Sequence, residues 1–305
     1  AITSYPDREY TSLRRCIAAY CGTETENVIV GNGSTELISL FIQVEHPKKA
    51  LVIGPTYSEY EREIALGGGT TLYYPLREAD DFKLNVEDFL SHLNESIDLL
   101  VICNPNNPTS SSIPRSDMRH ILDVCKQYDI YVMVDETYVE FADNMAELTA
   151  VPLTNYYNNI VILRGTSKFF AAPGLRLGYA ISSNQDILEE MSWKLQQWNV
   201  SVPAQMAGVA ALEKPKEYIR QTREYVSGQR EYMRNIMKMM GYVVFASKAN
   251  YLFFKGRPGL EKEALEAGFL IRDCQNYEGL SEGFYRIAVR TKEENERLIT
   301  WLGRL

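Results

Sequence analysis

Residues 164–178, RGTSKFFAAPGLRLG, place a lysine between a Thr-Ser pair and two phenylalanines, ahead of a Pro-Gly turn. Arg176 follows Lys168 by eight positions. A neighbouring cation and partial desolvation both favour the neutral form of a lysine amine, and a neutral amine can form an imine with an aldehyde. Ser167 and Arg176 add a hydroxyl and a guanidinium, which are ligands for an anion. The segment therefore predicts a reactive amine beside an anion-binding site.

A second candidate for anion binding is GNGST at 31–35, which stands between an apolar run and a helix-like segment. At a helix start, Gly33, Ser34 and Thr35 would offer free backbone N–H groups and hydroxyls to an anion. The plainer alternative is a helix N-cap made by Ser34 or Thr35. The spacing differs from the G-x-G-x-x-G turn of a nicotinamide dehydrogenase, which disfavours that class.

Four more polar or aromatic residues follow apolar runs, and each has a structural and a chemical interpretation. Asp135 is either a turn or cap residue or the partner of a cation such as a protonated pyridine nitrogen. Asn107 either shapes an Asn-Pro turn or donates its amide to a phenolate oxygen, which Tyr138 could also reach. Tyr57 is either core or a ring that lies over another flat ring. With Lys168 and the anion cradle, these groups describe a site for pyridoxal 5′-phosphate (PLP).

The elements that would position these residues are short apolar runs that end in polar loops and alternate with helix-like segments. Runs of this kind, apolar on both faces, indicate an α/β fold in which a mostly parallel sheet is covered by helices on both sides. Ligands in such folds bind beyond the carboxyl ends of the strands, so we expect all the candidate residues at one edge. The segments are 27–42, 49–57, 98–109, 116–129, 130–138, 159–168 and 176–182.

The chain of 305 residues is long for a single core, so a large and a smaller domain are expected. We assign 20–211 to the large PLP-binding domain. We assign 212–305, together with 1–19, to a small α+β domain that closes over the substrate. Its first part is a long charged helix or helix pair that ends at Gly241, and shorter strands follow.

Composition narrows the function classes. The net charge of −8 argues against nucleic acids and anionic membranes as partners. Five scattered cysteines without a C-x-x-C pair, and three histidines far apart, indicate reduced thiols in a cytoplasmic protein and no metal site. There is no apolar run long enough for a bilayer span and no signal peptide. The first residue is not methionine, so an N-terminal segment is expected to be missing.

In seven blocks the chain resembles the aspartate-aminotransferase-like (fold type I) PLP enzymes, and within them the histidinol-phosphate aminotransferase and threonine-phosphate decarboxylase subgroup. The resemblance runs from residue 5 to residue 290. The blocks are YPD, GNGSTE, PTYSEY, NPNNPT, VDETYVEF, TSKFFAAPGLRLGY and YRIAVR.

This resemblance implies the role of each residue. Lys168 would form the imine, and Asp135 would pair with the pyridine nitrogen. Asn107 and Tyr138 would hold the ring oxygen, and Tyr57 would stack on the ring. The implied phosphate ligands are Ser34, Thr35, Ser167 and Arg176, with Gly33 in the same loop.

The resemblance also implies a homodimer and a substrate site. Tyr5 matches a tyrosine that reaches the phosphate of the neighbouring subunit's cofactor, and Arg286 matches the arginine that takes the substrate's anionic group. Two positions depart from the family pattern: Ser110 replaces the usual glycine after NPT, and Thr137 replaces alanine in DEA. The family's N-terminal segment, which helps to close the site, is absent from the sequence.

The cofactor residues serve both transamination and decarboxylation, so the reaction depends on the segment 271–295. Arg272, Arg286 and Arg290 lie close together there, and Arg286 and Arg290 would share a face of one strand. Either two of the three make surface ion pairs, or together they bind a substrate with two anionic groups.

The block RDC…GL…RIAVR resembles the threonine-phosphate decarboxylases of the cobalamin pathway, and we favour that reaction. The alternative is histidinol-phosphate aminotransferase, or a related transaminase that uses glutamate and 2-oxoglutarate. A non-catalytic regulator domain on the PLP fold is a more distant alternative.

Overall fold

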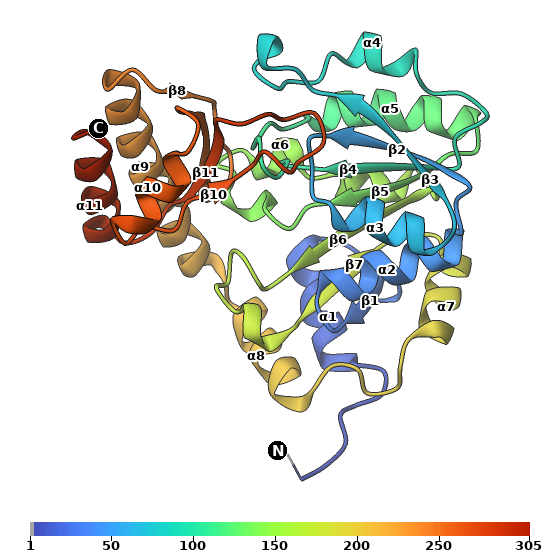
Figure 1. Ribbon diagram of the computed structural model, residues 1–305. Coiled ribbons are helices and arrows are strands. Elements are labelled where there is room, and N and C mark those ends of the chain that lie inside the picture. The colour runs from blue at the N-terminus through green and yellow to red at the C-terminus, as the bar shows by residue number, and fades with distance from the viewer. Residues whose placement is uncertain (1–2) are drawn as a thin grey trace.

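The computed structural model describes residues 3–305 and contains two β-sheets (Figure 1). The larger sheet has seven strands in the order β1-β7-β6-β5-β4-β2-β3, and only β7 runs against the others. The expected mostly parallel sheet is therefore confirmed. Its strands are β1 (Val28–Gly31), β2 (Lys49–Gly54), β3 (Thr70–Pro75), β4 (Leu99–Cys103), β5 (Tyr131–Asp135), β6 (Ile160–Gly165) and β7 (Gly178–Ile181).

Helices cover both faces of this sheet because successive strand residues point to opposite sides. In β4, Leu99 and Val101 join the core on one face, and Leu100 and Ile102 join the core on the other. The first face is covered by α2 (Ser34–Glu45), α3 (Glu59–Leu66) and α7 (Gln185–Lys194). The second is covered by α1 (Thr11–Cys21), α4 (Val86–Leu90), α5 (Arg115–Gln127) and α8 (Val202–Glu213). The short α6 (Met145–Leu148) lies beside α5.

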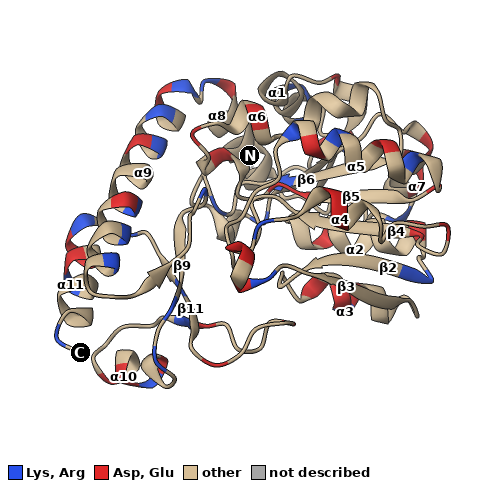
Figure 2. Cartoon of the chain, turned by 90° about the horizontal axis from the view of Figure 1, so that it is seen from above, with Lys and Arg blue, Asp and Glu red and all other residues tan. Residues whose placement is uncertain are grey.

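The smaller sheet is antiparallel, in the order β10-β11-β9-β8. Its strands are β8 (Val243–Val244), β9 (Tyr251–Lys255), β10 (Arg272–Asp273) and β11 (Phe284–Ala288), and its helices are α9 (Lys216–Met239), α10 (Leu260–Glu266) and α11 (Lys292–Leu302). Figure 2 shows charges of both signs along α9, the long charged helix expected from the sequence. Nowhere in residues 3–305 is a helix both long and apolar enough to cross a bilayer.

The N-terminal helix does not join the smaller sheet, which corrects the assignment of residues 1–19 to the small domain. Leu13 and Ile17 of α1 are fully buried in the core of the large sheet, where α1 packs against α8 and β1. Residues 1 and 2 lie outside the described part. An apolar stripe of this kind is buried wherever a complementary face is available, and here that face belongs to the large sheet.

We call the large sheet with its covering helices the large body, and the small sheet with α9, α10 and α11 the smaller body. A loop of the large body packs into the smaller one. Phe82, which follows β3, packs edge-on against Phe245, Phe253 and Phe284, with ring centroids 5.0, 5.3 and 5.8 Å away. All four rings belong to one continuous buried cluster. One face of the smaller sheet therefore joins the core of the large sheet, while its other face packs with α9, α10 and α11 in a core of its own.

Candidate active site

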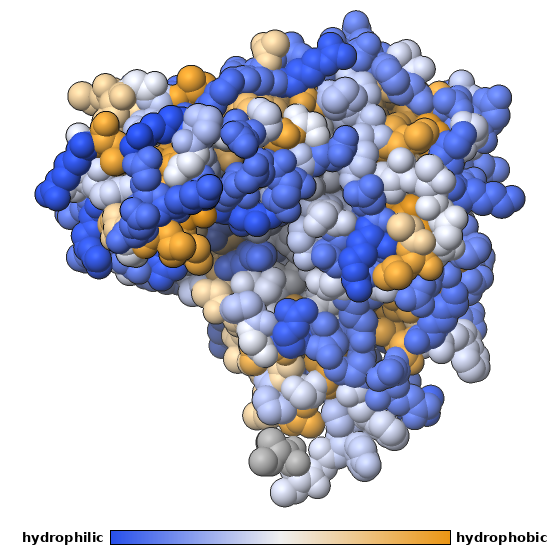
Figure 3. Space-filling model, in the orientation of Figure 1, coloured by the Kyte–Doolittle hydropathy of each residue, from blue (hydrophilic) through white to orange (hydrophobic). Residues whose placement is uncertain are grey.

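A cavity of about 210 Å³ lies at the edge of the large sheet where the parallel strands end and the reversed β7 begins. Figure 3 shows the surface hollowed where the two lobes meet. Except for Gly33 and Tyr5, every residue expected to bind the cofactor lines this cavity. The lining residues are Ser34, Thr35, Ile38, Tyr57, Tyr60, Cys103, Asn107, Asp135, Thr137, Tyr138, Ser167, Lys168, Pro173 and Arg176.

The GNGST turn has the geometry of an anion cradle. Gly33 is the N-cap of α2 at φ 86°, and no side chain caps the helix, so the alternative of a Ser34 or Thr35 cap is not observed. The first N–H groups of a helix have no partner within it. A Cβ on Gly33 would collide with the Arg176 guanidinium, and a Cβ on Gly178 would collide with the backbone of Ser34. The two glycines thus let Arg176 approach the positive end of α2 closely.

Asp135 ends β5 as a buried carboxylate that is 4% exposed. The Tyr60 hydroxyl donates to its Oδ2 at 2.6 Å, and the Thr137 amide and hydroxyl donate to Oδ1 at 2.9 and 2.7 Å. Within the described range, Asp135 forms no ion pair. A buried carboxylate held only by neutral donors is poised to accept a cation.

Tyr60 and Thr137 were not identified as site residues from the sequence. Tyr60 lies three positions after Tyr57, and the two rings meet edge-on at 5.6 Å. That spacing brings both side chains to one side of a helical turn, which is the signal that could have identified Tyr60. Thr137 was visible only as a departure from the family pattern.

Asn107 and Tyr138 both present donors to the cavity. The Asn107 Oδ1 accepts hydrogen bonds from Arg286 and, at 3.4 Å, from Tyr277. With its carbonyl occupied in this way, the amide nitrogen stays available as a donor. Burial raises the pKa of Tyr138, despite the opposing charge of Arg286, so the phenol keeps its proton. Tyr277, from the smaller body, was not identified from the sequence either.

Lys168 follows β6, and its Nζ lies 5.6 Å from the centroid of the Tyr138 ring. The residue is exposed because it lines an open cavity, yet the surrounding protein displaces enough water to affect its charge. Desolvation lowers the pKa of Lys168 most, and Arg286 and Arg176 lower it further, against a smaller opposing effect of Asp135. These surroundings thus weaken the hold of the Lys168 amine on its proton.

Of the three arginines expected to bind substrate, two are brought together. Arg272 and Arg286 are paired residues of β10 and β11. The Arg286 guanidinium lies 5.1 Å from the Tyr251 ring centroid and bonds Asn107 at the cavity. The Arg272 guanidinium lies 5.4 Å from the ring centroid of Tyr277.

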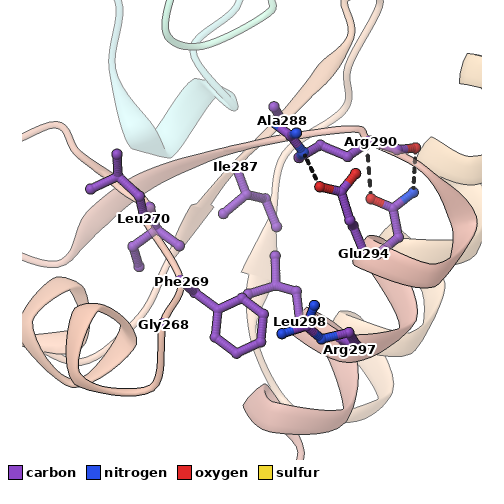
Figure 4. Close-up of a pocket in the computed structure, with 11 residues that line it drawn as sticks. Gly268, Phe269, Leu270, Ile287, Ala288, Arg290, Glu294, Arg297 and Leu298 are labelled. Atoms are coloured by element: carbon purple, nitrogen blue, oxygen red, sulfur yellow. Dashed lines mark hydrogen bonds and ion pairs between the residues drawn. The ribbon is translucent and has the colours of Figure 1, made fainter.

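Arg290 is the exception, which corrects the expectation that it shares a strand face with Arg286. β11 ends at Ala288, and Arg290 pairs with Glu294 at 3.0 Å with 65% of its side chain exposed. Arg290 lines a different pocket of about 280 Å³ (Figure 4), which shares no residue with the first. For Arg290, the surface ion pair is the arrangement observed.

Tyr5 also lies outside the cavity. It is 79% exposed, and its ring lies 4.7 Å from that of Trp198, which is 41% exposed. Two aromatic rings exposed side by side form a surface on which another chain could pack.

The donor set fits PLP. Its phosphate would meet the cradle of Arg176 and the start of α2, and its pyridine nitrogen would meet Asp135. Its ring oxygen would meet Asn107 and Tyr138, and its aldehyde would meet Lys168. A buried carboxylate without a cation and a glycine-lined cradle at a helix start are features that this ligand would complete.

Comparison with known proteins gives a consistent result. The family model for aminotransferase class I and II matches residues 1–302. A protein from Caldanaerobacter subterraneus subsp. tengcongensis, whose name assigns it provisionally as a threonine-phosphate decarboxylase, is 36% identical over 98% of this chain and 82% of its own length. The threonine-phosphate decarboxylase of Salmonella typhimurium is 32% identical over 99% and 83%. The crystal structure of the histidinol-phosphate aminotransferase from Clostridium acetobutylicum superposes with a TM-score of 0.93 at 28% identity, over 99% of this chain and 90% of that one.

Proposed function

The chain belongs to the class I and II aminotransferases, a family of PLP-dependent enzymes, and on that premise we propose that it decarboxylates a phosphorylated amino acid, with threonine phosphate as the substrate. When bound, PLP supplies an electron-withdrawing ring that accepts the electron pair of a bond broken at the substrate's α carbon. The remaining work falls to residues of this chain.

The paired arginines carry this proposal. Directly opposite residues of an antiparallel pair have Cβ atoms about 5 Å apart, so Arg272 and Arg286 extend from the same face of the small sheet. Two arginines paired on one face of neighbouring strands are suited to a substrate with two anionic groups, such as a carboxylate and a phosphate. Arg286, which contacts Asn107, would take the carboxylate, and Arg272 would take the phosphate nearer the rim.

The polar groups of the cavity would hold the cofactor and move protons. Asp135, fixed by Tyr60 and Thr137, would keep the pyridine nitrogen protonated. Lys168, with its lowered pKa, would hold the aldehyde carbon. Once the substrate amine has replaced it there and given up a proton to the Lys168 Nζ, Lys168 would deliver that proton to the α carbon that carbon dioxide has left.

A homodimer in the cytoplasm completes the proposal. Exposed Tyr5, beside Trp198, would contribute its hydroxyl to the phosphate site of a second copy. Size-exclusion chromatography with light scattering tests this directly: Tyr5→Phe should remain dimeric but bind PLP more weakly. A monomeric parent protein would contradict the proposal.

Transamination of histidinol phosphate remains the second candidate, because the solved structure with the TM-score of 0.93 is such an aminotransferase. In that reaction Lys168 would remove the proton from the α carbon instead of supplying one. The test is to incubate the holoenzyme with L-threonine O-3-phosphate and measure carbon dioxide, and in parallel with histidinol phosphate and 2-oxoglutarate and measure glutamate. Carbon dioxide without glutamate supports the decarboxylase, and glutamate without carbon dioxide overturns it.

A further inference from the structure

Ser110 is a serine at a backbone position that favours glycine. Its φ is +58°, in the left-handed region, and the residue is 1% exposed. A side chain in this conformation is disfavoured in L-residues, and such positions persist where the surroundings hold them in place. The Ser110 hydroxyl must therefore make contacts that a glycine could not.

Those contacts cross from the large body to the turn that precedes β9. The Ser110 Oγ lies 2.9 Å from the Ser247 Oγ, and it accepts hydrogen bonds from the amides of Lys248 and Ala249 at 2.9 and 3.0 Å. The Ser247 hydroxyl donates to the Tyr251 carbonyl at 2.6 Å, so its own proton is used and Ser110 is the donor between the two serines. One donor and two acceptor positions are all that a hydroxyl has, and all are occupied.

The same turn determines where Arg286 lies. Tyr251 begins β9, and its hydroxyl donates to the Asn106 carbonyl at 2.6 Å. Its ring lies beneath the Arg286 guanidinium at 5.1 Å and packs edge-on against Tyr138 at 5.2 Å. The loop that contains Asn106 and Ser110 therefore bonds this segment at two points, residues 247–249 and Tyr251. The Arg286 guanidinium lies over the second of these points.

We propose that Ser110 is a positioning residue that fixes the small sheet against the cofactor loop and thereby holds Arg286 at the substrate site. The inference rests on the proposed function only in treating Arg286 as the ligand of the substrate carboxylate. A glycine at 110 would keep the backbone conformation and release this contact.

The direct test is amide hydrogen exchange in Ser110→Gly holoenzyme. The Lys248 amide loses its acceptor, so its exchange should accelerate about tenfold, the effect of losing one buried hydrogen bond. The Ala249 amide keeps a second acceptor, the Ser247 hydroxyl at 3.2 Å, so its exchange should accelerate less. Asp129→Gly is the matched control, because Asp129 has the same φ of +58° but is exposed and precedes the opposite end of β5. Unchanged exchange at Lys248 in Ser110→Gly would overturn the proposal.

Kinetics test the positioning role. Ser110→Gly should raise KM for L-threonine O-3-phosphate about fivefold and leave the affinity for PLP unchanged, whereas Asp129→Gly should change neither. Ser247→Ala should give a similar rise, and the double variant should show less than the product of the two single effects. A Ser110→Gly enzyme with the parent's KM would overturn the role even if exchange accelerates.

Arg286→Leu distinguishes a failure of the proposed function from a failure of the inference about Ser110. If it leaves KM for L-threonine O-3-phosphate unchanged, the proposed function fails, while the exchange data still decide whether Ser110 joins the two bodies. If Arg286→Leu raises KM and Ser110→Gly does not, the substrate site stands and the inference about Ser110 is wrong.

Discussion

Glu140 is a buried carboxylate that the proposed chemistry does not use, and it should make the protein less stable as pH rises. It lies two residues after Tyr138 and has no exposed surface. Among the described residues, neither of its carboxylate oxygens has a hydrogen-bond partner. The nearest cation is Arg164, 4.0 Å away, and Arg164 is already bonded to Glu136 at 2.7 and 3.0 Å.

The size of the effect follows from this environment. Burial raises the pKa of Glu140 from 4.5 to about 7, opposed mainly by Arg164 and helped by the negative charge of Glu136. The folded protein therefore keeps a proton that the unfolded chain loses above pH 4.5. The contribution of Glu140 to the free energy of unfolding is fully present below pH 4.5 and is lost as the pH rises through 7. Since one pKa unit corresponds to about 1.4 kcal/mol, the loss is about 3 kcal/mol.

The substitution Glu140→Gln keeps the shape and removes the titration. Urea unfolding at fixed protein concentration, at pH 5 and pH 8, should show the parent losing about 2.5 kcal/mol more between the two values than the variant does. Glu147→Gln, an exposed position on α6, is the control and should behave as the parent. Glu45, whose pKa is also raised to about 7 by burial, contributes equally to both proteins. Equal losses in Glu140→Gln and parent would refute the reasoning.

Four further predictions concern the site. Lys168→Ala should abolish the visible absorbance band of the bound cofactor that depends on the lysine amine, and a band that survives in the variant would contradict the PLP assignment of Lys168. Arg272→Leu should raise KM for L-threonine O-3-phosphate at least about tenfold in initial-rate assays, because a charge-assisted contact is lost. Arg290→Gly should leave KM within about twofold of the parent. A larger rise would show that Arg290 contributes to substrate binding. Thr137→Ala should lower kcat about fivefold with little change in KM, because Asp135 loses one of its donors. An unchanged kcat would show that the Thr137 side chain only packs and does not support Asp135.

Much of the site could be predicted because parallel strands bring sequence-distant loops to one edge. Asn107 and Lys168 follow β4 and β6, and Asp135 is the last residue of β5. The three strands are neighbours in the sheet, so knowing where each apolar run ends is enough to predict that the three residues lie together. Arg176 joins them because β7 is reversed and its first residues lie at the same edge. The grouping of these residues depends on the order and direction of the strands, which the alternation of apolar runs and helix-like segments indicates.

The parts that could not be predicted depend on where an element stops or on which neighbour it finds. Arg290 would share a face with Arg286 if the strand continued, but β11 ends and a capping box of Thr291 and Glu294 starts α11, which places Glu294 beside Arg290. The apolar stripe of α1 predicts burial but not which sheet buries it. Tyr277 reaches Asn107 from a loop with no pattern at all.

The aromatic cluster around Phe82 has a consequence for synthesis on the ribosome. The last strand of the large sheet is complete at Ile181, but the ring of Phe82 packs against Phe284, which is made about a hundred residues later. In a nascent chain that has completed only the large sheet, the apolar side chain of Phe82 therefore still lacks the rings that bury it. Domains that fold as they emerge bury their cores before the next begins, and this protein cannot do so until β11 has left the exit tunnel.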